Sequence, residues 1–411
     1  MRIFVALSLA ALAQCAGQRL DLRELVSEAL RRNPEVLAAQ KKYEATRQRP
    51  AQERSLPDPT LSVGWNSTGN PLPFAGVGKD PVANVGLMAS QEFPAPGKLR
   101  LRGEVASKEA EAEAQEYRAA ELGVVARVKT AYFSLEHAWL MQGVLERSRE
   151  LLRSLLHVTE ARYSVGKAAQ ADVFKAQTQI SVIETRLLQF EREKRAREAE
   201  INSLLNRAPN ATLAQPGEAH SEPLAFTVEQ LIAKAPVSAP ALVRDQKLIE
   251  RAGTALNLAR RNYYPDVTVN GGYYYMGSMP PMYMLRADVK IPIRLGRTRA
   301  EVTERSQEVS QAKYAYEATA QSLQYRIRDE YLAAETAQKL VNLYTQTVMP
   351  QARLAVDSSL ASYQTGGTEF LSVLTNQLAA IDYEMNYHEQ LHEFHAALVR
   401  LEQLTGVELI Q

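Results

Sequence analysis

The sequence has almost no cysteine, almost no net charge and few aromatic residues. Cys15 is the only cysteine among 411 residues, which excludes disulfide scaffolds, cysteine-rich zinc sites and CxxC redox pairs. The 48 basic and 47 acidic side chains leave a formal net charge of +1. Nothing in that balance favours nucleic acid as a partner, because binding to phosphates depends on clustered positive charge. Aromatic residues make up 7%, and the abundance of Ala, Leu, Gln, Glu and Arg favours long helices over a compact mixed core.

Long apolar runs are also missing. After the first 17 residues, no apolar run approaches the roughly 18 residues that a membrane-spanning helix requires. If the mature chain lies in a membrane, it must cross as β-strands, and that restricts it to an outer membrane.

The amino terminus predicts an export signal over residues 1–17. A short apolar run, Ile3 to Ala13, follows Met1-Arg2 and is too short to span a bilayer as a helix. The segment Ala11-Leu12-Ala13 fits ordinary cleavage. The segment Leu12-Ala13-Gln14-Cys15 has the form of a lipoprotein box, except that Gln14 stands where a small residue is normal. Lipidation of Cys15 and an incidental Cys15 at a trimmed terminus both stay open, and the second is favoured.

The chain contains an internal repeat. Leu25, Ala29 and Val36 recur as Leu231, Ala235 and Leu242, at a constant offset of 206 residues. Further along, Tyr163-x-x-Gly166 recurs as Tyr363-x-x-Gly366 at an offset of 200. The small change in offset indicates short insertions, while the order of helices and strands is the same in both copies.

Each copy predicts a helix, a β-hairpin and two long helices. The first copy covers 18–207 and the second 225–411, joined by a linker over 208–224 that is rich in Pro, Gly, Ala and Ser. The predicted hairpins are 60–68/83–93 and 266–275/283–293. The predicted long helices are 98–163 and 168–206 in the first copy, and 297–362 and 368–405 in the second.

The hairpins have the alternation of a membrane β-barrel wall. Leu285, Ala287, Val289 and Ile291 alternate with Arg286, Asp288 and Lys290. A half-buried hairpin of a soluble domain would not accept those three charges in its core, whereas a wet lumen does. Four strands cannot close a barrel, since the smallest membrane barrels need about eight. The strands therefore predict an oligomer whose subunits share one barrel.

The helices have coiled-coil spacing. The stretch 98–163 contains no proline and would extend about 100 Å as one helix. Ile180, Ile183, Leu187 and Phe190 recur at intervals of three and four residues in the next helix, which is typical of coiled-coil packing.

With this order of elements, the chain resembles the TolC family of outer-membrane efflux proteins. The segments that carry the resemblance are ALRRNPEVLAAQ, YYPDVTVNGGYYY, ARYSVGKAAQADVFKAQTQI and ASYQTGGTEFLSVLTNQL, which together span essentially the whole mature chain. The resemblance implies a mainly α fold in which three protomers share a 12-stranded barrel in the outer membrane. The barrel would continue into a periplasmic tube of α-helices.

The resemblance also implies a function. The protein would be a passive homotrimeric duct without enzymatic activity or cofactor, embedded in outer-membrane lipid and extending into the periplasm. A periplasmic adaptor would couple it to an inner-membrane pump, expected to be of the RND type. The alternative is a periplasmic or lipid-anchored coiled-coil scaffold that transports nothing.

The resemblance places the periplasmic mouth at the two helix turns that contain Tyr163, Gly166, Tyr363 and Gly366. Family members often have acidic residues just after the second turn, but this chain has Ser372 and Thr375 there. Asp172 and Glu369 are the remaining candidates for an acidic gate.

The sequence His388-Glu389-Gln390-Leu391-His392 matches the HExxH pattern of zinc peptidases. His395 follows on the same helical face. Neither a glycine nor a third histidine follows at the metzincin spacing, and the motif lies in a predicted coiled-coil helix. A solvated helix face is therefore favoured, over incidental metal binding and over peptidase activity.

Four of the nine methionines, Met276, Met279, Met282 and Met284, lie between the third and fourth predicted strands. Thioethers are soft ligands suited to Cu(I) or Ag(I), so these residues are weak candidates for a metal site. The segment is similar to the Met-Pro-x-Met loop of the heavy-metal RND efflux branch (CusC/CzcC-like), which favours metal cations as cargo.

Overall fold

The computed structural model describes residues 19–69, 71–217 and 223–410. These residues are mainly α-helical and include a single four-stranded sheet, which confirms the fold class predicted from the sequence. The elements of the first half are α1 (Leu22–Arg32), α2 (Pro34–Thr46), α3 (Arg49–Arg54), β1 (Thr60–Asn66), β2 (Asn84–Phe93), α4 (Lys98–Ser164) and α5 (Gln170–Leu204). Those of the second half are α6 (Val228–Ser238), α7 (Pro240–Arg261), β3 (Asp266–Tyr275), β4 (Met282–Lys290), α8 (Leu295–Leu343), a π-helical turn (Tyr344–Val348), α9 (Met349–Thr365) and α10 (Phe370–Thr405).

The chain forms two compact units, and each contains parts of both sequence copies. Unit 1 comprises Met1–Ala39, Tyr117–Pro240 and Ala320–Gln411, as far as these residues are described, and unit 2 comprises Gln40–Glu116 and Ala241–Thr319. Unit 2 holds the sheet and the helix ends next to it. Unit 1 holds the long helical hairpins. No helix in the described part of the chain is both long and apolar enough to cross a membrane.

A proline ends the first helix of each copy at the same place. Asn33 and Ala239 have extended backbone (ψ 123° and 116°) and are each followed by the proline that starts the next helix. The cause is steric, because a proline ring disfavours helical geometry in the residue before it. Residues that correspond in the predicted repeat are also buried alike, such as Ala29 and Ala235 at 0% and 2% exposure.

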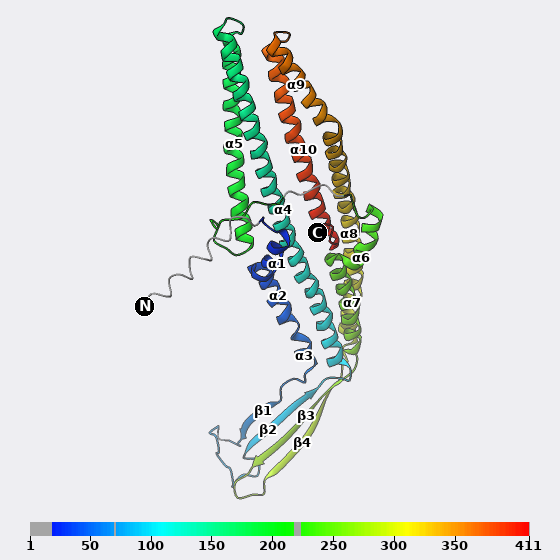
Figure 1. Cartoon of the computed structure of the whole chain (residues 1–411). Coiled ribbons are helices and arrows are strands. Elements are labelled where there is room, and N and C mark those ends of the chain that lie inside the picture. Colours follow the sequence, from blue (N-terminus) through cyan, green and yellow to red (C-terminus); the bar gives the residue numbers. More distant parts are fainter. Residues whose placement is uncertain (1–18, 70, 218–222, 411) are drawn as a thin grey trace, which may run out of the picture. The chain divides into compact units, whose positions relative to one another are not determined.

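The sheet joins the two copies through its central pair of strands. Its order is β1-β2-β3-β4 with every neighbour antiparallel (Figure 1). One row across the sheet is Leu61, Ala89, Gly271 and Leu285. Since alternate residues of a strand point to opposite faces, the register places the apolar positions of all four strands on one face.

The helical hairpins of unit 1 share an apolar core. α4 pairs with α5 and α9 pairs with α10, with the two connecting turns at the same end (Figure 1). Core residues recur at intervals of seven, such as Leu145 and Leu152 in α4 and Leu374 and Ile381 in α10. Ile183 is buried in this cluster, and Ile180, Leu187 and Phe190 pack against it, as the coiled-coil spacing indicates.

The observed elements differ from the predicted ones at several ends, and proline explains two of the differences. The helix predicted over 297–362 is interrupted by the π-helical turn Tyr344–Val348, just before Pro350 in α9. Proline has no N–H and its ring collides with the preceding turn, and the π turn accommodates this inside a helix. The strand predicted to reach residue 293 ends at Lys290, because Pro292 cannot donate to a strand ladder.

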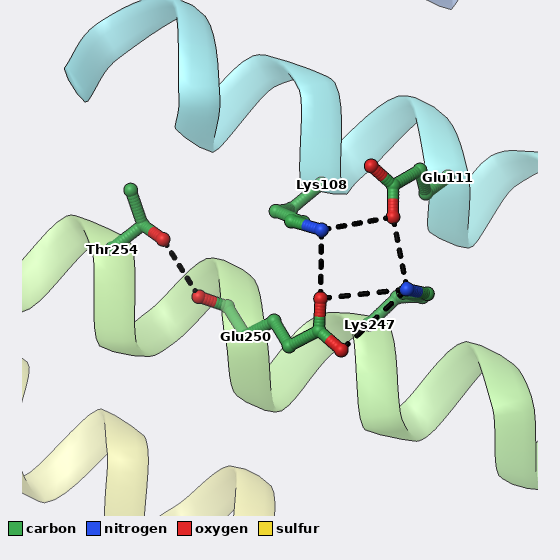
Figure 2. Close-up of polar contacts among 5 residues, drawn as sticks. All are labelled: Lys108, Glu111, Lys247, Glu250 and Thr254. Atoms are coloured by element: carbon green, nitrogen blue, oxygen red, sulfur yellow. Dashed lines mark hydrogen bonds and ion pairs between the residues drawn. The ribbon is translucent and has the colours of Figure 1, made fainter. Parts of the chain in front are cut away.

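In unit 2, a closed network of ion pairs connects α4 with α7 (Figure 2). Lys108 lies 3.1 Å from Glu111 and 2.8 Å from Glu250, and Lys247 lies 3.0 Å from Glu111 and 3.4 Å from Glu250. The hydrogen bond from Lys108 lowers the pKa of the Glu250 carboxyl. α4 follows β2 in the first copy, and α7 precedes β3 in the second. The two copies are therefore joined twice in unit 2, by the pairing of β2 with β3 and by this network.

Candidate functional site

The two helix turns of the predicted mouth have the same backbone geometry. Gly166 and Gly366 are left-handed, with φ of 74° and 85°. In the first turn, the N–H of Gly166 donates to the carbonyl of Tyr163 at 2.9 Å. In the second, the N–H of Gly366 donates to that of Tyr363 at 3.0 Å. Glycine suits both positions because left-handed geometry strains other residues.

The side chains of the two turns are not equivalent. Tyr163 is 46% exposed, whereas Tyr363 is 3% exposed and belongs to the core of the hairpins. The Arg162 guanidinium lies 4.4 Å from the centre of the Tyr363 ring and donates a hydrogen bond to the Tyr363 carbonyl oxygen. Arg162 lies in the last turn of α4 and Tyr363 in the last turn of α9, so this contact ties the first hairpin to the second. Sequence reasoning selected both tyrosines but missed Arg162.

The candidate acidic residues lie directly after the turns. Asp172 is in the first turn of α5, and its carboxylate is 3.7 Å from Lys175. Glu369 is the N-cap residue of α10 but makes no side-chain capping bond. Ser372 and Thr375 follow within α10. At the repeat offset of 200, Asp172 corresponds to Ser372 and Glu369 to Ala169, so both carboxylates follow a turn but do not occupy equivalent positions.

The sheet has one charged face and one apolar face. Arg286 and Asp288 form an ion pair at 3.0 Å, and Asn270 on the neighbouring strand donates to Asp288 at 2.7 Å. Lys290 lies on the same face, opposite Asp266. The opposite face exposes large apolar side chains at 37% to 83%: Leu61, Val63, Trp65, Leu87, Phe93, Val269, Tyr273, Leu285 and Val289.

Two of the four candidate methionines lie on the charged face of the sheet. Met282 and Met284 are in β4, two residues apart, and Met276 and Met279 are in the turn before it. Across Gly272, Met284 is in the same row as Met88 of β2. The Tyr274 hydroxyl lies 3.9 Å from the Met284 sulfur. The register therefore places three thioethers on one face.

The HExxH residues pack against another helix of unit 1. The carboxylate of Glu389 lies 3.1 Å from Nε2 of His137 in α4, and the rings of His137 and His392 stack at 5.0 Å. His395 stacks on Phe133 at 4.5 Å and is 5% exposed. The described residues contain no group of three or more His, Cys, Asp or Glu side chains that could hold a metal ion.

This histidine pair predicts acid sensitivity. Burial lowers the pKa of His137 and of His392 below the ordinary 6.5, and the charge of His392 lowers the pKa of His137 further, while Glu389 and Glu193 partly offset the effect. The unfolded chain then binds more protons than the folded chain as pH falls through 6.5, so stability decreases there. We expect His392→Phe, which keeps a ring against His137, to reduce the loss of Tm between pH 7.5 and 5.

The control for this prediction is His157→Gln, since the His157 side chain is 80% exposed. Thermal unfolding of the full chain at several pH values compares the two variants. An equal pH dependence of Tm in both would contradict a role of the buried pair.

The fold and these sites define a class of protein whose chain combines a two-faced β-sheet with long helical hairpins that end in glycine turns. Comparison with known proteins identifies the family. The sequence pattern of the outer membrane efflux proteins matches residues 25–207 and 231–407. The chain therefore belongs to the outer membrane efflux protein family.

Individual relatives agree in fold and length. The outer membrane protein TolC of Vibrio cholerae serotype O1 is 22% identical, over 98% of this chain and 94% of that protein. The solved structure of the outer membrane protein VceC of Vibrio cholerae has a TM-score of 0.80 at 19% identity, covering 95% of this chain and 97% of that one. CusC has a TM-score of 0.78 at 16% identity, covering 93% and 91%.

Proposed function

We propose that this chain is the outer-membrane channel subunit of a tripartite efflux system, and that three copies form a passive duct. The observation that carries the proposal is the sheet. Among the described residues, β1 and β4 each have one edge that pairs with no other strand. Four strands cannot close a barrel, whereas three copies supply twelve. Pairing of β4 with β1 of the next copy satisfies both edges.

The apolar face has the dimensions of a lipid-facing wall. Its rows run from Val267 to Tyr275 along β3, which is about 27 Å at 3.3–3.4 Å per residue. Tilted strands of that length match the roughly 25 Å apolar band of outer-membrane barrels. Tyr273, Tyr275 and Tyr283 lie at one end of the face, where aromatic residues mark a membrane interface. On this proposal, Arg286, Asp288 and Lys290 face a water-filled lumen.

Two neighbouring substitutions in β4 test the proposal. Leu285 is 83% exposed and lies mid-way along the apolar face. If that face contacts lipid, Leu285→Arg should cost about 2–4 kcal/mol and strongly reduce the trimer recovered from outer membranes. Arg286→Gln, on the other face of the same strand, should assemble normally. Both variants are compared by membrane fractionation, by the size of the purified oligomer and by planar-bilayer conductance.

The alternative, a coiled-coil scaffold without transport, gives a different result. An exposed leucine of a soluble hairpin tolerates arginine, so both variants would behave like the wild type. Equal recovery of the two variants, together with a wild-type protein that does not conduct, would refute the duct.

We further propose that the turns at Gly166 and Gly366 form the periplasmic mouth, where the adaptor docks. Asp172 and Glu369 would supply carboxylates just inside it. Cation selectivity, recorded in bilayers for Asp172→Asn and Glu369→Gln, tests this gate. Selectivity equal to that of the wild type in both variants would exclude it.

The remaining parts of the proposal concern partners and cargo. An inner-membrane pump, expected to be of the RND type, would supply the energy. Metal cations are the proposed cargo class, supported by the thioethers of Met88, Met282 and Met284 on the lumen-side face. Replacing these three methionines by leucine should lower the silver tolerance of cells that depend on this channel, and unchanged tolerance would remove this support. Cys15 lies outside the described residues, so its lipidation stays a prediction.

A further inference from the structure

A cavity of about 370 Å³ lies in unit 2 where β4 passes into α8. It is lined by the end of β4, the connection 291–294, the first turns of α8, and residues at the ends of α7, β3 and α4. Its charged side chains are Lys98, Lys290, Arg294, Arg297, Asp266 and Glu301. Four cations against two carboxylates leave an excess of two positive charges.

The carboxylates of the cavity are engaged by other groups. Asp266 accepts hydrogen bonds from Lys98 at 2.8 and 3.0 Å and from the backbone N–H of Ala95 at 2.7 Å. Glu301 accepts a hydrogen bond from Asn262 at 2.9 Å. The charge of the buried Lys98 is therefore balanced by Asp266. The excess positive charge comes from the more exposed Lys290, Arg294 and Arg297.

Arg294 and Arg297 carry that excess. Neither guanidinium has a hydrogen-bond or ion-pair partner within the described ranges, and both line the cavity three residues apart. Lys290 adds a third cation from the end of the strand. Arginine side chains bind phosphate oxygens through paired N–H donors, so the cavity suits a phosphate group.

The same cavity has an apolar rim. Ile291 and Ile293 are lining residues and are 66% and 81% exposed, and the Tyr264 ring is 54% exposed. Large exposed apolar side chains beside unpaired cations favour a ligand that has an anionic group next to hydrocarbon. A free phosphate would leave this rim in water, whereas a phospholipid would cover it.

We propose that this cavity binds the phosphate of an anionic phospholipid, with the isoleucines against its glycerol and acyl region. The choice of lipid as the source rests on the proposed function, which places the apolar face of the sheet in a bilayer and the start of α8 at its periplasmic surface. Basic pockets at membrane interfaces bind anionic headgroups in this way. Tyr264 lies at the same level, where aromatic rings anchor a protein at the interface.

The test uses the full-length oligomer in detergent and native mass spectrometry with phosphatidylglycerol or phosphatidylcholine. We expect the wild type to prefer phosphatidylglycerol. Arg294→Gln/Arg297→Gln should lower the apparent affinity for this lipid by about thirtyfold, the factor expected for two cations near an anionic headgroup. The matched control is Arg260→Gln/Arg299→Gln, which removes the same charge from exposed arginines of α7 and α8 that do not line the cavity.

Three results would overturn the inference: equal binding of both lipids by the wild type, an equal loss in the control pair, or saturation of the site by inorganic phosphate with no competition from phosphatidylglycerol. Bilayer conductance of the same preparations separates this inference from the duct. A protein that conducts but binds phosphatidylglycerol independently of Arg294 and Arg297 contradicts the cavity alone. A protein that does not conduct, yet loses the lipid only in the cavity variant, contradicts the duct and supports the cavity.

Discussion

Replacing Arg162 by alanine is expected to raise the conductance of the reconstituted channel by about an order of magnitude or more. The Arg162 side chain stacks on the Tyr363 ring and donates to the Tyr363 carbonyl, which joins α4 to α9 at their turns. A hydrogen bond from a charged donor contributes about 1.5–3 kcal/mol, and a guanidinium over an aromatic ring adds about 0.5–2 kcal/mol. On the proposed function, with this contact holding the mouth closed, a loss of 2 kcal/mol shifts the closed-to-open equilibrium about thirtyfold.

Two control variants separate this contact from a general loss of charge or polarity. Arg149→Ala removes an arginine of the same helix whose ion pair is with the adjacent Glu150, so conductance should stay unchanged. Tyr363→Phe keeps the ring under Arg162 and removes a buried hydroxyl that has no hydrogen-bond partner among the described residues, so it should also be neutral. If the Arg162→Ala channel conducts like the Arg149→Ala channel, the contact between Arg162 and Tyr363 does not control opening.

The elements of this fold could be predicted from the sequence because their signals are local. Pro34 and Pro240 end the first helix of each copy by a clash with the residue before them. In β4, the alternation of Leu285 and Val289 with Arg286 and Asp288 specifies both the strand and its two faces. Two such signals were overlooked, and both are prolines. Pro292 ends β4 at Lys290, and Pro350 causes the π-helical turn.

The contacts within the candidate sites could not be predicted, because they join residues far apart in the chain. Arg162 stands next to Tyr163 in a selected segment, yet its partner is Tyr363, and no local period relates the two. In the same way, His392 was selected as a candidate metal ligand, and the structure pairs it with His137. In the cavity proposed to bind lipid, Lys290, Arg294 and Arg297 are close in sequence, but Lys98 comes from the first copy and meets them only in the folded chain.

The second large effect concerns a buried ion pair that sequence analysis missed. Lys129 of α4 lies 2.6 Å from Glu402 of α10, and the two side chains are 8% and 9% exposed. Lys129 also donates to the carbonyl of Ile410 at 3.1 Å. The other oxygen of Glu402 accepts the N–H groups of Leu409 and Ile410, both at 2.6 Å. One ion pair therefore holds α4, α10 and the segment after α10 together within unit 1.

Lys129→Met is expected to destabilise the protein by about 3–5 kcal/mol, because it leaves the Glu402 carboxylate buried without a counter-charge. Unfolding in urea, followed by circular dichroism of the purified oligomer, measures the loss. Arg195→Met is the control, since it breaks an i,i+4 pair with Glu191 whose arginine is 75% exposed, and it should cost less than about 1 kcal/mol.

The double variant Lys129→Met/Glu402→Gln shows how the pair acts. Glutamine removes the buried charge, and its amide oxygen still accepts from the backbone N–H groups of Leu409 and Ile410, so most of the lost stability should return. If the double variant is as unstable as Lys129→Met, the packing of the lysine stem, and not the uncompensated carboxylate, accounts for the loss. Recovery would show that the charge pair itself adds little net stability. Its role would then be to specify that α4 and residues 409–410 pack at the end of α10.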